Sequence, residues 1–217
     1  VLFRSEQFGG FAMGIGATVP LVESMGRHML CTPYISATIA AQAIARCGSE
    51  PQQSKWLPAL VKGTIGTLAL LDNEDWGATS TSCELTTKDG QLELKGKKLL
   101  VHDASVSDFF LVLTQHDGAE VLVIVESSQL ADNAIDSKTL VDETKRAANV
   151  DFTGVTIQSD AILPSGGAAL ADLRLIGALL IASEATGSAA GALDTVVDYL
   201  TTRKQFDRLI GSYQSLK

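Results

Sequence analysis

The chain is poor in cysteine and in aromatic residues. Its 217 residues include 3 cysteines, and phenylalanine, tryptophan and tyrosine together make up 6%. Cys31, Cys47 and Cys83 are odd in number and form neither a Cys-x-x-Cys pair nor a metal-ligand spacing with histidine. The cysteines therefore argue against a disulfide framework and predict no metal site. They favour free, buried thiols in a reducing compartment, with the cytoplasm as the default location.

Basic runs and long apolar runs are scarce as well. No run of Lys and Arg exceeds two residues, and the formal net charge is −8. Because nucleic acids and anionic membranes attract basic patches, we expect neither as a partner. The longest apolar candidate, Leu175–Ala182, is bounded by Arg174 and Glu184 and is shorter than the roughly 20 residues of a membrane span. The sequence therefore predicts no membrane-spanning segment.

The few prolines divide the first part of the chain. Helical spacing between them predicts short helices around residues 20–30, 34–47 and 51–61. Ser49, followed three residues later by Gln52, resembles a capping box at the start of the third helix. Residues 168–202 contain no proline, so one helix about 50 Å long is expected there. Such a helix would outgrow any single partner within the chain.

Between these helical regions the apolar period changes from 3.6 to 2. Short runs of β-branched and aromatic residues lie at 66–71, 83–104, 108–115, 120–126 and 149–157. We expect an α+β multi-domain fold: an N-terminal α-helical domain (1–63), a central antiparallel β-barrel or sandwich domain (64–163), and the start of a C-terminal helical bundle (164–217).

Small residues recur in the middle of the long helix. Gly187 and Gly191, with alanines at three- and four-residue spacing, predict that a neighbouring helix approaches closely. A Gly-x-x-x-Gly pair is also a membrane dimer motif, but Glu184, Asp194 and Asp198 on the same helix argue against that alternative.

Five stretches together resemble the acyl-CoA dehydrogenase family. They are "FGG" and residues 48–71, 96–112, 142–155 and 199–217. The last, "YLTTRKQFDRLIGSYQSLK", is the most specific, because its Arg, its Phe and its Ile-Gly-x-x-Gln match together. The resemblance runs from about residue 8 to Lys217 and implies a bacterial family member. It also implies that this is a fragment ending near the start of the second helix of the C-terminal bundle.

The resemblance implies a function. A subunit of this family takes a proton from Cα of an acyl-CoA thioester and passes a hydride from Cβ to N5 of FAD, giving a trans-2-enoyl-CoA in fatty acid metabolism. It implies an electron-transfer flavoprotein or similar acceptor, and a homotetramer or heterotetramer. Two alternatives stay open: a catalytically silent partner subunit of a heteromeric enzyme, or a flavin monooxygenase or acyl-CoA oxidase on the same fold.

Two strand ends resemble flavin cradles. Leu71, Asp72, Asn73 and Gly77 match the family's Thr-Glu-Pro-x-x-Gly-Ser segment, with Leu71 replacing a hydroxyl that could bond the flavin ring, and Leu70 just before them is a further candidate flavin contact. A strand running into an acidic surface loop is the alternative. The second cradle consists of Leu100, Val101 and His102, although His102 alone would be an ordinary strand-end residue.

A third group lies at the end of the long helix. The resemblance implies that Arg203, with Gln205 and Phe206 beside it and Gln214 further on, reaches the FAD of a neighbouring subunit. A solvated arginine at a helix end, favoured by the helix dipole, is the alternative reading of Arg203.

The catalytic base is not expected in this chain. Gly177 occupies the position where some relatives carry the catalytic Glu, and Ala178 replaces an arginine. Glu184 is expected to serve packing or a hydrogen bond. The resemblance therefore places the base beyond Lys217, and leaves Gly77 and Gly177 as candidate substrate contacts.

Overall fold

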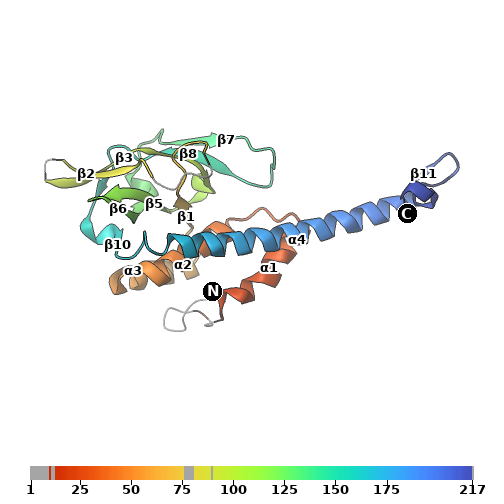
Figure 1. Ribbon diagram of the computed structural model, residues 1–217, viewed down its shortest axis with the longest axis horizontal. Helices are drawn as coiled ribbons and strands as arrows, with labels where there is room; N and C mark the ends of the chain where they lie inside the picture. Colours follow the sequence, from red (N-terminus) through yellow and green to blue (C-terminus); the bar gives the residue numbers. More distant parts are fainter. Residues whose placement is uncertain (1–9, 11–12, 76–80, 89, 217) are drawn as a thin grey trace.

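The computed structural model describes residues 10, 13–75, 81–88 and 90–216. Three helices come first, followed by a group of strands and then by one long helix (Figure 1). The helices are α1 (Val19–Arg27), α2 (Tyr34–Cys47), α3 (Glu50–Val61) and α4 (Leu170–Thr202). Their bounds agree closely with the expected ones, because Pro20 and Pro51 lie in the first turns of α1 and α3, where a missing N–H costs nothing.

The predicted capping box of α3 is confirmed. The backbone N–H of Gln52 donates to Ser49 Oγ at 3.5 Å, and the N–H of Ser49 donates to Gln52 Oε1 at 2.8 Å. Two N–H groups that have no partner inside the helix are thereby satisfied. The Gln52 side chain also donates to the carbonyls of Asp160 and Ile162, so the start of α3 is tied to the strands.

The strands form two sheets and a terminal hairpin. The larger sheet has the order β10-β6-β5-β2-β3-β9, with β1 paired to β5; the smaller sheet has the order β4-β8-β7; and β11 pairs with β12. The strands are β1 (Gly66–Ala69), β2 (Glu84–Lys88), β3 (Gln91–Lys95), β4 (Lys97–His102), β5 (Phe109–His116), β6 (Ala119–Glu126), β7 (Ile135–Lys138), β8 (Ala147–Asp151), β9 (Thr156–Ile157), β10 (Ile162–Leu163), β11 (Lys204–Gln205) and β12 (Arg208–Leu209).

The larger sheet is mixed rather than purely antiparallel. β1 runs parallel to β5, with Gly66 opposite Phe109, while β5 and β6 form an antiparallel hairpin. A parallel pair needs a long connection between its strands, and β2, β3 and β4 supply it. The expected arrangement of a helical part and a β part is present; the parallel pairing is the feature that periodicity could not reveal.

β5 lies between two hydrophobic cores. Phe109, Leu111 and Leu113 pack with the helices, whereas Phe110 and Val112 pack with the smaller sheet. Because successive side chains of a strand point to opposite faces, a strand covered on both sides must be apolar throughout. The run "FFLVL" is therefore the centre of a three-layer arrangement of helices, larger sheet and smaller sheet.

The expected close helix approach is confirmed between α1 and α4. A Cβ added to Gly26 would lie 2.0 Å from the carbonyl oxygen of Glu184, and one added to Gly187 would lie 1.8 Å from that of Glu23. Ser188 Oγ donates to the carbonyl of Gly26 at 3.1 Å across the same crossing. The glycines therefore allow the two backbones to touch.

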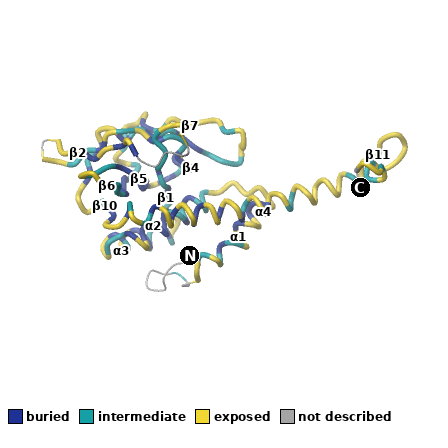
Figure 2. The backbone as a smooth tube through the Cα atoms, viewed as in Figure 1, coloured by how far each residue is buried: buried dark blue, intermediate teal, exposed yellow. Residues whose placement is uncertain are grey.

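α4 extends far beyond its partners. Its buried residues run from Leu170 to Gly187, and its C-terminal half is exposed (Figure 2). By length and composition alone the helix could cross a membrane, since one 18-residue window has a mean hydropathy of 1.3. By length and composition, the prediction that no segment is apolar enough to span a membrane is therefore not met. The packing of its N-terminal half on α1 and α2 is nevertheless that of a bundle helix.

The three cysteines are free, but they are not all buried. Burial raises the pKa of the thiols of Cys47 and Cys83. Cys31 is exposed in the connection between α1 and α2, so the expectation of buried thiols is wrong at that position.

Candidate functional site

A pocket of about 350 Å³ lies between the helices and the ends of β1 and β4. α2 contributes Ile35, Ser36 and Ile39, and α4 contributes one face that runs from Leu173 through Gly177 to Glu184. Thr67, Leu68 and Leu70 come from β1 and the residue after it, and His102 and Asp103 come from the end of β4. Residues 144–146, which precede β8, complete the wall.

The pocket changes character along α4. Leu68, Leu70 and Leu173 belong to or pack on the helix-side core, so one end is apolar. Lys145 and Glu184 form an ion pair at the other end, with side chains 33% and 14% exposed. A ligand with an apolar body and a polar end would match this gradient.

The two strand ends that resemble flavin cradles are joined through their backbones. The N–H of Leu99 donates to the carbonyl of Leu71 at 2.7 Å. Thr67 Oγ1 donates to the carbonyl of His102 at 2.7 Å. One hydrogen bond therefore joins β4 to β1, and the other joins β4 to the residues after β1. The edges of β1 and β4 therefore form one continuous surface beside the pocket.

Leu100 distorts β4 at this surface. Its φ is +47°, in the left-handed region that disfavours residues other than glycine, and the pairing with β8 shifts between Lys98 and Val101. The N–H of Leu100 donates to Asn149 Oδ1 at 3.1 Å instead of joining the strand ladder. Such local strain persists where the surroundings hold it in place, and it gathers at functional sites.

The structure brings only some of the predicted cradle residues to the pocket. Leu70, His102 and Gly177 line it. The side chain of Val101 is 2% exposed and packs between the sheets, so it can contribute only backbone atoms. A Cβ at Gly177 would lie 3.5 Å from Ile39 Cδ1, an ordinary contact, so the position has room for a methyl group. Gly77 lies outside the described residues.

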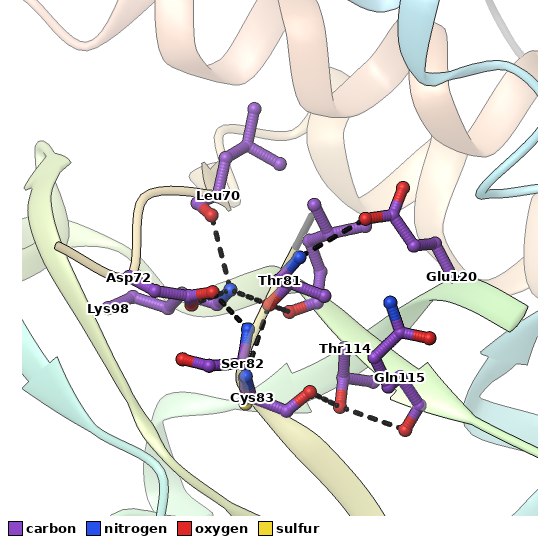
Figure 3. A network of polar contacts seen from close by, with 10 residues as sticks. Leu70, Asp72, Thr81, Ser82, Cys83, Lys98, Thr114, Gln115 and Glu120 are labelled. Carbon is purple, nitrogen blue, oxygen red and sulfur yellow. Dashed lines mark hydrogen bonds and ion pairs between the residues drawn. The ribbon is translucent and has the colours of Figure 1, made fainter. Parts of the chain in front are cut away.

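Asp72 belongs to a buried network beneath this surface (Figure 3). Its side chain is 7% exposed and forms an ion pair with Lys98, whose side chain is fully buried. Burial tends to raise the pKa of Asp72, but the hydrogen bonds from Lys98, Thr81 and the N–H of Ser82 outweigh burial and hold that pKa below its usual value. Burial lowers the pKa of Lys98, and Asp72 opposes this effect.

Sequence reasoning missed Lys98 and the charged group around Asp103. Ser36 Oγ donates to Asp103 Oδ2 at 2.7 Å, and Arg146 Nε lies 3.5 Å from Asp103 Oδ1. In β4 Lys97 is exposed and Lys98 is buried, and the adjacent pair of lysines does not itself reveal which of the two faces inward. Asp103, Ser36 and Arg146 come from three separate segments, so no local pattern joins them.

Arg203 and its neighbours lie far from the pocket. Arg203 caps the C-terminus of α4, and 26 residues of helix, about 39 Å, separate it from Gly177. Its guanidinium lies 6.0 Å from the ring centroid of Tyr199. Phe206, 89% exposed, occupies the turn between β11 and β12, and Gln205 and Gln214 are exposed nearby. Within one chain these residues and the two strand ends do not meet (Figure 1).

Comparison with known proteins gives a consistent result. Residues 2–64 match the model of the family described as acyl-CoA dehydrogenase, N-terminal domain. The chain is 25% identical to acyl-CoA dehydrogenase FadE12 of Mycobacterium tuberculosis, over 97% of this chain and 58% of the relative. It is 29% identical to acyl-CoA dehydrogenase FadE27 of the same species, over 97% of this chain and 55% of the relative.

A solved structure shares the fold. The ChsE4-ChsE5 complex from Mycobacterium tuberculosis matches with a TM-score of 0.84 and 24% identity, over 98% of this chain and 57% of the other. The chain thus spans somewhat more than half the length of the proteins it matches. The helix-strand-helix order, the pocket between α2, α4 and the strand ends, and the matches along nearly the whole chain agree. The chain thus resembles acyl-CoA dehydrogenases along nearly its whole length, and residues 2–64 match the N-terminal domain of that family.

Proposed function

We propose that the chain forms part of a FAD-dependent acyl-CoA dehydrogenase subunit, which converts an acyl-CoA thioester to a trans-2-enoyl-CoA. The observation that carries the proposal is the joining of two strand ends, β1 and β4, beside one pocket that is apolar at one end and charged at the other. Bound FAD would supply the hydride acceptor.

The residues around the pocket fit a flavin ring. Backbone hydrogen bonds at Leu71, Leu99 and His102 hold the two strand ends together, and Leu70 supplies apolar contact in the pocket. Leu71 cannot donate a hydrogen bond from its side chain. His102 lines the pocket, and its imidazole can donate or accept one. Backbone contacts and His102 therefore carry the proposed binding at this edge.

The chain's own residues would position the acyl group rather than abstract its proton. Ile39, Leu68 and Leu173 provide an apolar floor that excludes water from the acyl chain. The carboxylates that line the pocket, Asp103 and Glu184, each pair with a basic side chain. A free base would be supplied from elsewhere in the protein.

The separation of Arg203 from the pocket supports an assembly of subunits. We propose that Arg203 contacts the FAD of a neighbouring subunit in a homotetramer or heterotetramer, since 19 residues of helix, about 28 Å, separate it from Glu184, the pocket residue nearest to it along α4. An electron-transfer flavoprotein or a similar acceptor is proposed to reoxidise the enzyme. A cytoplasmic location is proposed on the free cysteines alone.

A second candidate function is that of a silent partner in a heteromeric enzyme. Leu71 lacks the hydroxyl, Gly177 lacks a carboxylate, and Ala178 lacks the guanidinium that family members carry at these places. One similar fold, ChsE4-ChsE5, is a complex of two different proteins.

Flavin binding and flavin reduction separate the two candidates. The full chain, purified with any natural companion, should bind FAD with quenching of flavin fluorescence. Under anaerobic conditions an acyl-CoA of suitable length should bleach the absorbance of the bound flavin near 450 nm, as is usual for flavins. Bleaching of flavin by the chain without its companion would support the active subunit, whereas flavin that the chain alone binds but leaves oxidised, and that is bleached once the companion is added, would support the silent partner. A complex of the full chain with its companion that binds no FAD would contradict both.

A further inference from the structure

The ammonium of Lys98 is held entirely by oxygen atoms of the chain. Lys98 Nζ donates to the carbonyl of Leu70 at 3.2 Å, to Thr81 Oγ1 at 2.8 Å and to Asp72 Oδ1 (Figure 3). A lysine has three donors, so each has an acceptor here. The side chain is fully buried, and burying a charge is costly unless it is paired and hydrogen-bonded.

The three acceptors come from two segments, the exit of β1 with Leu70 and Asp72, and the stretch before β2 with Thr81; of the three, Leu70 lines the pocket. Leu70 and Asp72 flank Leu71, whose carbonyl accepts the N–H of Leu99 at 2.7 Å. Lys98 precedes Leu99 in β4, so one side chain fixes both partners of this backbone contact. The next residue, Leu100, is the one in the left-handed conformation.

Asp72 and Thr81, which accept hydrogen bonds from Lys98, also form hydrogen bonds with other residues. The N–H of Ser82 donates to Asp72 Oδ2 at 2.5 Å, and that of Cys83 donates to Thr81 Oγ1 at 3.2 Å. The N–H of Thr81 donates to Glu120 Oε1 at 3.2 Å, which ties the segment to β6. Backbone hydrogen bonds thus fix Asp72 and Thr81, and Lys98 links both of them to the carbonyl of Leu70 at the exit of β1.

We infer that Lys98 is a positioning residue for flavin binding, which holds the exit of β1 and the strained part of β4 in the geometry that the cradle requires. The inference rests on the proposed function for the identity of the ligand, and on the described contacts for the geometry. Lys98 acts through Leu70 and Asp72 and does not itself line the pocket.

The test replaces the ion pair by apolar side chains in the full protein. Lys98→Met alone leaves the carboxylate of Asp72 buried without its partner and can prevent folding. The double variant Lys98→Met/Asp72→Leu removes both charges, and a buried pair replaced in this way often leaves a protein folded. Lys97→Met is the matched control, since Lys97 is 67% exposed and pairs with Asp151 away from the pocket.

Two readouts are measured where wild type and variants are fully folded by circular dichroism. The first is the Kd for FAD, expected to rise about tenfold in the double variant and to stay unchanged in Lys97→Met. The second is hydrogen exchange at the amide of Leu99 without FAD, expected to speed up in the double variant only, because its bond to Leu71 is no longer held.

A third pair of variants tests Thr81. Thr81→Ser keeps the hydroxyl that accepts from Lys98 and should preserve both readouts, whereas the isosteric Thr81→Val should shift both in the direction of the double variant. Folded variants with lower stability but with wild-type Kd and Leu99 exchange would overturn the inference. If the wild type binds no FAD, the proposed function fails, and the exchange measurement alone decides whether Lys98 holds the strand ends.

Discussion

Asp72 illustrates how one buried carboxylate couples the fold to pH. It is ionised next to Lys98 in a site largely closed to water, and its hydrogen bonds keep its pKa below the ordinary value despite burial. A carboxyl whose pKa is depressed by folding stabilises the folded state above its unfolded pKa, and that stabilisation is lost as the pH falls through the folded pKa.

We therefore expect the free energy of unfolding to fall as the pH drops below about 4, near the unfolded pKa of aspartate. Urea denaturation at pH values from 3 to 6 measures it. The Lys98→Met/Asp72→Leu variant should show a shallower fall, because it lacks the carboxyl of Asp72. The remaining slope comes from groups such as Asp151. Burial tends to raise the pKa of Asp151, but hydrogen bonds from Thr153 and Lys97 outweigh burial and hold that pKa below its usual value. An identical slope in the variant would show that Asp72 does not contribute.

Several site residues could be identified at this scale from sequence and others could not. Leu70, His102 and Gly177 were named from the resemblance and do line the pocket. Ser36, Asp103 and Arg146 were missed because their contact joins α2, the end of β4 and the start of β8. A contact between distant segments leaves no spacing for a sequence to display.

At the scale of elements, the crossing of α1 and α4 depends on glycine. Gly187 is buried, and its missing Cβ leaves room for the carbonyl of Glu23. Gly177, on the same helix, faces the pocket and has no such neighbour. The two glycines therefore form a natural comparison.

Gly187→Ala should lower the free energy of unfolding by about 1–3 kcal/mol, since the helices must separate to admit the methyl group. Gly177→Ala should instead raise it by about 0.5–1 kcal/mol, through the better helix propensity of alanine. Urea denaturation of both variants checks the difference. A Gly187→Ala variant as stable as Gly177→Ala would show that the backbones do not approach as closely as described.

The helices were predicted better than the sheets, for a local reason. Prolines, the Ser49 cap and the 3.6-residue period all lie within a few residues of the helix that they define. The short strands β7, β10, β11 and β12 were not predicted, because they are two to four residues long and, unlike β1 and β9, do not lie within a longer run of β-branched and aromatic residues. The parallel pairing of β1 with β5 depends on chain segments some forty residues apart, as Gly66 opposite Phe109 shows.

At the scale of the whole molecule, the half of α4 beyond Gly187 separates two groups of predicted flavin contacts. One group surrounds the pocket, and the other stands at the exposed end of the helix with the hairpin β11-β12 (Figures 1 and 2). Both can serve one flavin only if two chains combine. The arrangement thus makes assembly a condition of the proposed function.

Arg203→Gln in the full protein should weaken FAD binding about 10- to 100-fold, the range expected for losing a charge-assisted bond to phosphate. Its free energy of unfolding should change by less than about 0.5 kcal/mol, because the side chain is exposed. Arg208→Gln, in the same hairpin and stacked 3.6 Å from the ring centroid of Tyr213, is the control for a general loss of positive charge. Equal weakening by both substitutions would argue against a specific role of Arg203.

The sequence by itself determined the helices, the apolar strands, the small residues at a helix crossing and the resemblance to acyl-CoA dehydrogenases, because each depends on side chains close together in the chain or on a pattern shared with relatives. Only the tertiary structure decided that Lys98 is buried against Asp72, that Asp103 meets Arg146, and that Arg203 stands apart from the pocket. The physical reason is that burial, ion pairing and separation in space are set by which distant segments pack together, and packing follows from the whole core.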